Sequence, residues 1–319
     1  MRKVFFLVFS TLLLYQISVR GQSEAQVSQH MFCVESYNPS IIANTNNAIN
    51  LIGLYRQQWI GIPNAPQTAF FAANGSLGSF FNKKQGIGIA FVNDKLGVFS
   101  NQSVNLQYAL RFKLNDNYLS VGTNVGFVSQ TIAGDSIQKH LVQSDYHDMA
   151  GDLVIPTQSV NAVALDFGLG LMYTSKDYYA GLSVLHLFQP VLNLDDYLKT
   201  FIGRTAFITG GYDFPLNNIR YIFKPSLLVK TDFISLQTDL SARIEKDQKY
   251  WVGLSWRYQD AVVFFAGINL MNGLSVSCSY DLPTSKIIAY SIGSPEIVLR
   301  YSINLGKNKL NKYKSVRVL

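Results

Sequence analysis

The side chains that most often perform chemistry in enzymes are scarce in this chain, which has only 4 histidines among its 319 residues. One polar stretch combines two of these histidines with four aspartates: Asp135, His140, Asp145, His147, Asp148 and Asp152. Imidazoles and carboxylates bind divalent cations, but such ligands must converge, and a polar connection carries these residues for solubility alone. We therefore expect no resident metal in this stretch.

The other two histidines do not complete a catalytic group in the sequence. A hydrolase would need a serine nucleophile beside a histidine and an orienting polar group. His30 lies near the expected mature start, and His186 lies near an expected strand end. Gly-rich phosphate loops, Cys-x-x-Cys and paired-carboxylate motifs do not occur in the sequence. The chain is therefore predicted to be non-enzymatic and without a cofactor, and an enzyme that depends on His147 or His186 is the weakest alternative.

Alternation of apolar and polar residues is the strongest signal in the chain. Over residues 103–114 the apolar positions are Val104, Leu106, Tyr108, Leu110, Phe112 and Leu114. Successive side chains of a strand point to opposite faces, so this segment has one apolar and one polar face. Its length of about 12 residues suits a tilted strand that crosses a membrane. The same pattern returns over residues 234–244, 250–258 and 296–305.

Counting such segments predicts the fold class, an all-β transmembrane antiparallel β-barrel of about 14 strands, an even number as in single-chain bacterial barrels. The long connections over residues 131–159 and 189–203 follow odd-numbered strands and are expected to face outward. Residues 75–85 are expected to form an unusually long periplasmic turn. A soluble β-sandwich also alternates, but it predicts shorter strands and a more charged outer face.

Charged residues on the polar faces would line the lumen of such a barrel. They are Arg56, Arg111, Lys113, Asp166, Lys224, Lys230, Asp239, Arg243, Arg257, Asp281, Glu296 and Arg300. Both signs occur together, which suits a lumen closed by ion pairs, although a wide pore could present the same residues. For each of them the expected role is structural packing of the lumen.

The chain begins like an exported precursor. Arg2 and Lys3 precede an apolar run over residues 4–14, and small or polar residues follow up to Gly21. This order predicts a signal peptide over residues 1–21, and the apolar run is shorter than the roughly 20 residues of a spanning helix. The chain is 48% hydrophobic and 15% charged, with 18 Tyr and 21 Phe. An exported chain of this kind favours a closed barrel in the outer membrane, with both termini periplasmic.

Two segments flank the predicted barrel, which covers residues 48–305. Residues 22–47 contain apolar side chains and are expected to plug the lumen or to lie along the periplasmic rim. Residues 306–319 form a basic periplasmic tail whose candidate partner-binding residues are Lys307, Lys309, Lys312, Lys314 and Arg317. The tail favours an acidic partner or lipid headgroups and gives no support for nucleic-acid binding. The sequence leaves open whether Cys33 and Cys278 pair in an oxidising periplasm.

Short stretches along nearly the whole mature chain also carry a family resemblance. They include Ser-Gln-His-Met-Phe at residues 28–32, Gly-Leu-Tyr-Arg-Gln-Gln-Trp-Ile-Gly at 53–61, Val-Asn-Asp-Lys-Leu-Gly at 92–97, Trp-Val-Gly-Leu-Ser-Trp-Arg at 251–257 and Gly-Ser-Pro-Glu-Ile at 293–297. In this order they resemble the PorP/SprF family of type IX secretion membrane proteins. The chain departs from the family at Cys33, at Asn-Pro-Ser (residues 38–40) instead of Asn-Pro-Ala, and in its basic tail.

The resemblance implies a non-enzymatic outer-membrane component of the type IX secretion system of Bacteroidetes. Members support secretion or surface attachment of cargo, some of them serving gliding-motility adhesins, beside periplasmic ring and motor proteins and the translocon. The family-motif residues carried over, with individual roles unknown, are Arg56, Gln57, Trp59, Asn93, Asp94, Lys95, Arg257 and Glu296. The leading hypothesis is a partner-binding barrel in outer-membrane lipid. The alternative is an outer-membrane channel or transporter for a small or hydrophobic solute, gated by residues 22–47.

Overall fold

The computed structural model describes residues 24–44, 48–80, 83–137, 156–218, 220–270 and 273–305. Within these ranges, no helix is both long and apolar enough to cross a membrane. Strands dominate instead, together with short 3-10 turns. They are η1 (His30–Phe32), η2 (Val34–Ser36), η3 (Pro39–Asn44) and η5 (Lys286–Ala289).

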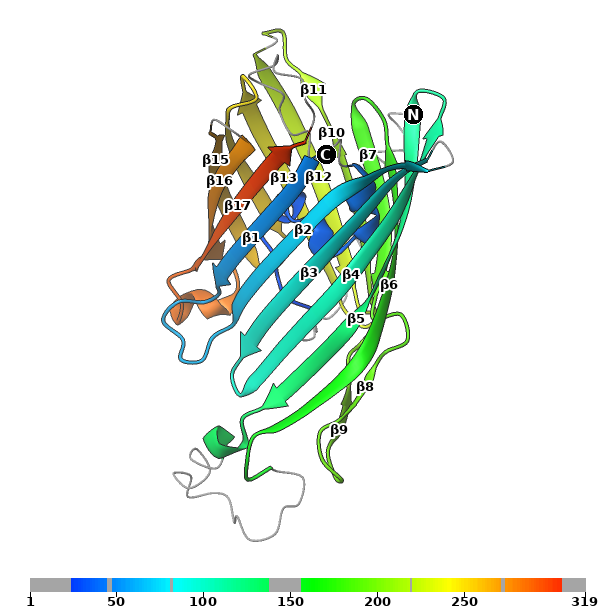
Figure 1. Cartoon of the computed structure of the whole chain (residues 1–319). Coiled ribbons are helices and arrows are strands. Elements are labelled where there is room, and N and C mark those ends of the chain that lie inside the picture. The colour runs from blue at the N-terminus through cyan, green and yellow to red at the C-terminus, as the bar shows by residue number, and fades with distance from the viewer. Residues whose placement is uncertain are drawn as a thin grey trace.

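The strands form one antiparallel sheet that closes on itself where β10 pairs with β12 (Figure 1). Fourteen strands of the described chain build the wall: β1 (Ala48–Gln57), β2 (Gln67–Phe80), β3 (Lys83–Leu96), β4 (Phe99–Leu114), β5 (Asn117–Ile132), β6 (Val160–Thr174), β7 (Tyr178–Leu185), β10 (Thr205–Tyr212), β12 (Tyr221–Thr231), β13 (Leu236–Lys246), β14 (Tyr250–Arg257), β15 (Ala261–Asn269), β16 (Leu274–Pro283) and β17 (Ser294–Asn304). The short β11 (Phe214–Pro215) continues β10 along β12. The predicted barrel and its strand number are confirmed.

The two ends of the barrel differ. At the end called here the loop end lie the connections between β5 and β6 and between β7 and β10, and the second of these contains a hairpin of β8 (Val191–Asn193) and β9 (Lys199–Phe201). At the opposite turn end, β1 begins and β17 finishes. The predicted long turn over residues 75–85 was wrong. β2 continues to Phe80 and β3 starts at Lys83, with a register shift between Ser76 and Gly78. Glycines and polar residues hid the alternation there, but backbone pairing does not require apolar side chains.

Side chains alternate across the wall as expected. Val104 and Leu106 are 42% and 62% exposed on the outer face, whereas Asn105 and Gln107 between them are buried on the inner face. The outward residues provide the apolar surface that lipid requires, and the inward residues provide a polar lumen. Alternation also separates the two cysteines. Both are free thiols: Cys278 is exposed on the outer face, and Cys33 is buried inside.

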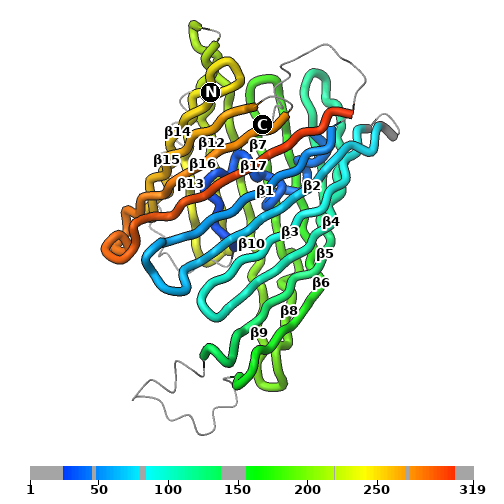
Figure 2. Tube along the Cα trace, turned by 60° about the vertical axis from the view of Figure 1, so that its left-hand side comes forward, coloured from blue at the N-terminus to red at the C-terminus, as the bar shows by residue number. Residues whose placement is uncertain are grey.

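Residues 24–44 run through the lumen from the loop end toward the turn end (Figures 1 and 2). The described part of the chain thus begins at the loop end. Nearly every side chain over residues 28–43 is buried. Phe32 packs on Trp251 with ring centroids 5.3 Å apart, and Tyr37 stacks on Phe207 at 5.4 Å. The core of the protein is therefore formed between this segment and the inner face of the barrel.

Inward-facing glycines leave room for the segment. A Cβ atom added at Gly122 would lie 2.5 Å from the backbone of Ser40, and one at Gly86 would lie 2.3 Å from the carbonyl oxygen of Ile42. Because side-chain atoms cannot approach backbone so closely, these glycines let η3 press against the wall.

Candidate functional site

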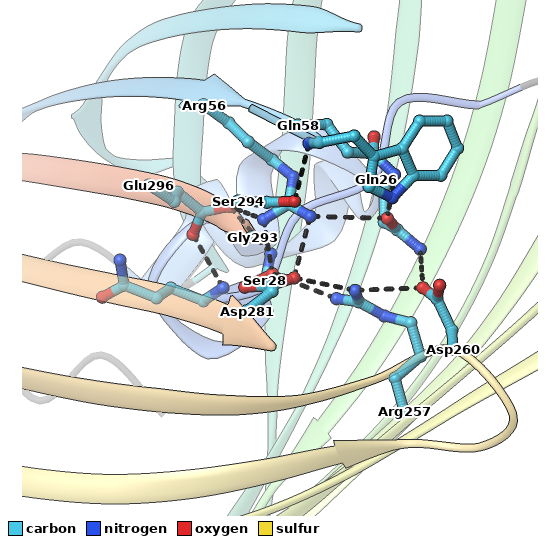
Figure 3. A network of polar contacts seen from close by, with 12 residues as sticks. Gln26, Ser28, Arg56, Gln58, Arg257, Asp260, Asp281, Gly293, Ser294 and Glu296 are labelled. Atoms are coloured by element: carbon cyan, nitrogen blue, oxygen red, sulfur yellow. Dashed lines mark hydrogen bonds and ion pairs between the residues drawn. The ribbon is translucent and has the colours of Figure 1, made fainter. Parts of the chain in front are cut away.

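The most concentrated polar structure of the described lumen lies at the loop end and binds residues 28 and 29 (Figure 3). We call it the latch; it consists of Ser28, Arg56, Arg257, Asp281 and Glu296. The Glu296 carboxylate accepts hydrogen bonds from the backbone N–H groups of Ser28 (2.8 Å) and Gln29 (2.9 Å). A carboxylate that accepts two adjacent backbone donors fixes the chain direction whatever the side chains are.

The Ser28 hydroxyl is the centre of the latch. It donates to Asp281 at 2.7 Å and accepts from Arg56 at 2.7 Å and from Arg257 at 3.1 Å. Both guanidinium groups also reach Asp281 directly, at 2.8 Å from Arg56 and 3.0 Å from Arg257. Three strands and the lumen segment are thereby joined at one hydroxyl.

Further polar contacts extend the latch toward the loop end. Arg257 binds Asp239 at 2.8 Å and Asp260 at 3.4 Å. Gln26 donates to Asp260 at 2.9 Å, and Gln58 donates to Gln26 at 2.8 Å. These contacts place residues 26–29 in a continuous network.

Burial determines how much the latch contributes. The side chains of Arg56, Arg257 and Asp281 are only 1–2% exposed. Burying ions is costly unless each is paired, so removing one partner of such a group destabilises far more than the pair contributes on its own. The charges of the latch therefore act together, and we expect the loss of any one of them to release the segment.

A second anchor holds the beginning of the described chain. His186 lies between two carboxylates; its Nδ1 atom is 3.0 Å from Asp166, and its Nε2 atom contacts Glu24. The Lys230 ammonium donates to the Glu24 backbone carbonyl at 3.2 Å. Burial alone would lower the pKa of His186, but the carboxylates of Glu24 and Asp166 raise it to about 10. Two neighbouring carboxylates thus favour the protonated, cationic form of His186 at neutral pH.

This second anchor is expected to loosen at high pH. The pKa of His186 rises from an ordinary 6.5 to about 10 in the folded protein, so its stabilisation is complete below about pH 6.5, declines as pH rises and is lost above about pH 10. The pKa of Glu24 is lowered by the His186 cation in spite of burial, so the Glu24 contribution is lost only in acid. The measurement is electron paramagnetic resonance of a nitroxide at position 25, with Cys33 and Cys278 replaced by serine.

A mobile spectral component should become dominant above about pH 10. In His186→Gln it should already be present at neutral pH and change little on raising the pH. An immobile spectrum in the unsubstituted protein up to about pH 11 would contradict this assignment.

The structure brings together only three of the eight family-motif residues, namely Arg56, Arg257 and Glu296. Gln57 is half-buried beside the latch, and the Trp59 backbone N–H donates to Ser294 at 2.9 Å. Asn93 accepts from Gln102 at 3.0 Å, Asp94 accepts from Thr68, and Lys95 is exposed. These five residues lie at the loop end, outside the latch.

The predicted lumen charges divide between the two ends. Arg56, Arg257, Asp281 and Glu296 belong to the latch, Asp239 contacts it, and Asp166 and Lys230 belong to the His186 anchor. The others lie toward the turn end: Arg111, Lys113, Lys224, Arg243 and Arg300, of which Lys113 is exposed and the rest are buried or half-buried. The basic tail and the histidines His140 and His147 lie outside the described residues. Within those residues, no group of three or more histidine, cysteine or acidic side chains is placed to hold a metal ion.

Sequence reasoning did not select the lumen-segment residues of either anchor, Glu24, Gln26 and Ser28, or the role of His186. Short polar residues at the start of the lumen segment carry no periodic signal, and apart from Arg56 and Gln58 their partners lie more than 150 positions away in the chain. The available indication was indirect: apolar residues within 22–47 required burial somewhere.

The sheet is a closed antiparallel barrel with an apolar outer face, and residues 24–44 are held inside its lumen. These features define a plugged β-barrel of the outer-membrane class. A family model described as "Type IX secretion system membrane protein PorP/SprF" matches residues 19–301. The chain therefore belongs to the PorP/SprF family, and the resemblance seen in the sequence is confirmed.

Solved structures with a similar arrangement are also outer-membrane barrels. The toluene transporter TbuX of Ralstonia pickettii is 10% identical, with a TM-score of 0.49 over 87% of this chain and 94% of that chain. The toluene transporter TodX of Pseudomonas putida is 9% identical, with a TM-score of 0.46 over 89% and 96%. A comparison with curated proteins found no match. At these identities the structural likeness concerns the fold alone.

Proposed function

We propose that this outer-membrane barrel is a non-enzymatic, partner-binding component of type IX secretion, which supports the secretion or surface attachment of cargo, including adhesins of gliding motility. The observation that carries the proposal, beyond family membership, is the occupied lumen. Residues 24–44 fill it and are fastened at the loop end by the latch and by His186. This occupied lumen supports a role carried out at the surfaces of the barrel over free passage of solutes through an open pore.

The proposed orientation places the turn end in the periplasm and the loop end at the cell surface. The turn end combines short connections with the origin of the basic tail, and it is the surface offered to periplasmic ring, motor and translocon proteins. The loop end offers the hairpin of β8 and β9 and the connection between β5 and β6 to cargo or adhesin. Tyr197 and Phe201 in that hairpin are 66% and 64% exposed, as residues of a contact surface are.

The test is a pull-down of the tagged full chain from its native outer membrane in mild detergent, with mass spectrometry of the retained proteins. Machine or adhesin proteins should be retained. Glutamine in place of Lys307, Lys309, Lys312, Lys314 and Arg317 should release the periplasmic partner proteins. A tail of the same composition in scrambled order should still retain any partner protein that is bound through charge alone. A barrel recovered alone that conducts ions would overturn the proposal in favour of the solute channel.

A further inference from the structure

A cavity of about 310 Å³ lies at the turn end, between the lumen segment and the barrel wall. We call it the turn-end cavity. Its lining includes Arg111 of β4, Arg243 of β13, Trp251 of β14 and Arg300 of β17, together with Phe32 of the segment and Tyr118 of β5. Its volume is at the lower limit of those that accommodate small organic ligands. The latch and the His186 anchor lie at the other end, so neither accounts for these residues.

Donors in this lining lack acceptors. The Nε atoms of Arg111 and Arg243 and the indole Nε1 atom of Trp251 are buried and have no hydrogen-bond partner among the described residues. The three residues are 8%, 6% and 5% exposed. Leaving a buried donor unpaired costs roughly 1–3 kcal/mol, so native proteins seldom do so without a reason. Since all three groups are donors only, what they lack is an acceptor.

The charges of the cavity also favour an anion. Six cationic side chains and four carboxylates line it. Two of those carboxylates are engaged by one lysine, because Lys224 binds Asp213 at 3.1 Å and Glu245 at 3.4 Å. The other two, Asp116 and Asp177, lie in the turns at the rim. Within the described chain, Arg300 forms no ion pair within 4 Å, although its charge acts on the buried Glu35 carboxylate, and Arg243 approaches Glu245 only to 3.8 Å.

Aromatic rings hold two of the guanidinium groups in place. Arg111 lies 4.0 Å from the centroid of the Tyr118 ring, and Arg243 lies 4.8 Å from that of Phe32. Stacking of this kind orients a guanidinium while leaving its N–H edge available for a planar oxyanion. The same rings offer an apolar surface to whatever carries the oxyanion.

We infer that the turn-end cavity binds a small organic anion, in which a carboxylate or phosphate group is attached to an apolar body. Arg243, Arg300 and the Trp251 indole N–H receive the oxyanion, with Arg111 across the cavity. Phe32 and Tyr118 contact the apolar part. The inference does not depend on the proposed role in secretion, because a ligand here requires neither a partner protein nor an open lumen.

The experiment uses the tryptophan that lines the site. The chain has 3 tryptophans; replacing Trp59 and Trp256 by phenylalanine leaves Trp251 as the only tryptophan of the purified full chain, and it is excited selectively over the 18 tyrosines. Benzoate and phenyl phosphate are titrated as probes, and their relative affinities distinguish a carboxylate site from a phosphate site. Benzyl alcohol is the neutral control. Both anions, or one of them, should change the fluorescence saturably, and benzyl alcohol should bind at least tenfold more weakly.

Arg300→Met should weaken the bound anion at least tenfold, and Arg300→Lys, which keeps the charge but not the forked donor, should weaken it less. The matched control is Lys113→Met, since Lys113 is an exposed cation at the same end outside the cavity lining. Heat-modifiable migration on electrophoresis verifies that each barrel is folded. Equal responses to the anions and to benzyl alcohol, or an affinity unchanged in folded Arg300→Met, would overturn the inference.

Discussion

Arg56→Met is expected to raise the rate at which Cys33 reacts with a water-soluble maleimide by at least about 100-fold, measured in a Cys278→Ser background. Arg56 contacts Ser28, Asp281 and Glu296, and its side chain is 1% exposed. Its loss leaves the buried Glu296 carboxylate without its cation and leaves Asp281 with Arg257 alone, a change that costs roughly 3–5 kcal/mol. Each 1.4 kcal/mol is about a tenfold change in the population of the released segment. Cys33 is buried within that segment, so its thiol reports the release directly.

The matched control for this variant is Arg220→Met. Arg220 also pairs with an aspartate, Asp247, at 3.0 Å, but its side chain is 66% exposed. An exposed pair contributes little, so Cys33 should react at the rate of the parent protein. If Arg56→Met stays folded and its Cys33 reacts no faster than that of Arg220→Met, the latch does not hold the segment.

The second large effect is expected at the wall rather than at the latch. Gly122→Ala should lower the free energy of unfolding in urea by roughly 1–3 kcal/mol, because an added Cβ would lie 2.5 Å from the Ser40 backbone and η3 would have to move. The contact is with backbone atoms of η3, so relieving it requires a movement of η3 or of β5. The substitution should also accelerate the reaction of Cys33.

Gly53→Ala is the control for that substitution. Gly53 is likewise a strand residue of the wall, and a Cβ added there meets nothing within 4 Å. Alanine in place of a strand glycine that has room is neutral or slightly stabilising. Equal stabilities of the two alanine variants would mean that residues 38–43 do not press against β5.

The barrel could be predicted because its determinants are local. Each strand such as residues 103–114 carries its own alternation, and lipid outside and polar groups inside impose the same period on every strand. The prediction for residues 75–85 was wrong for the same reason. Glycines and polar residues replace the alternating side chains there, so the strands continue without the apolar and polar alternation that would reveal them.

The site could be predicted only in part. Arg56, Arg257 and Glu296 were selected because they lie on polar faces and in family motifs, but what they bind was not visible in the sequence. Glu296 accepts hydrogen bonds from backbone N–H groups, and because every non-proline residue has such a group, the sequence does not mark the partner. Ser28, one of the two donors, is 268 positions from Glu296 in the chain. Which leader residue meets which strand is fixed by barrel closure, a property of the whole chain.

Residues 24–44 occupy the lumen, and we propose that the protein works through its surfaces. The most direct test is the single-channel conductance of the purified, unsubstituted barrel in a planar lipid bilayer at neutral pH. The closed lumen predicts a silent membrane, with current steps appearing only in latch variants such as Arg56→Met. Stable, uniform current steps from the unsubstituted barrel would contradict the account.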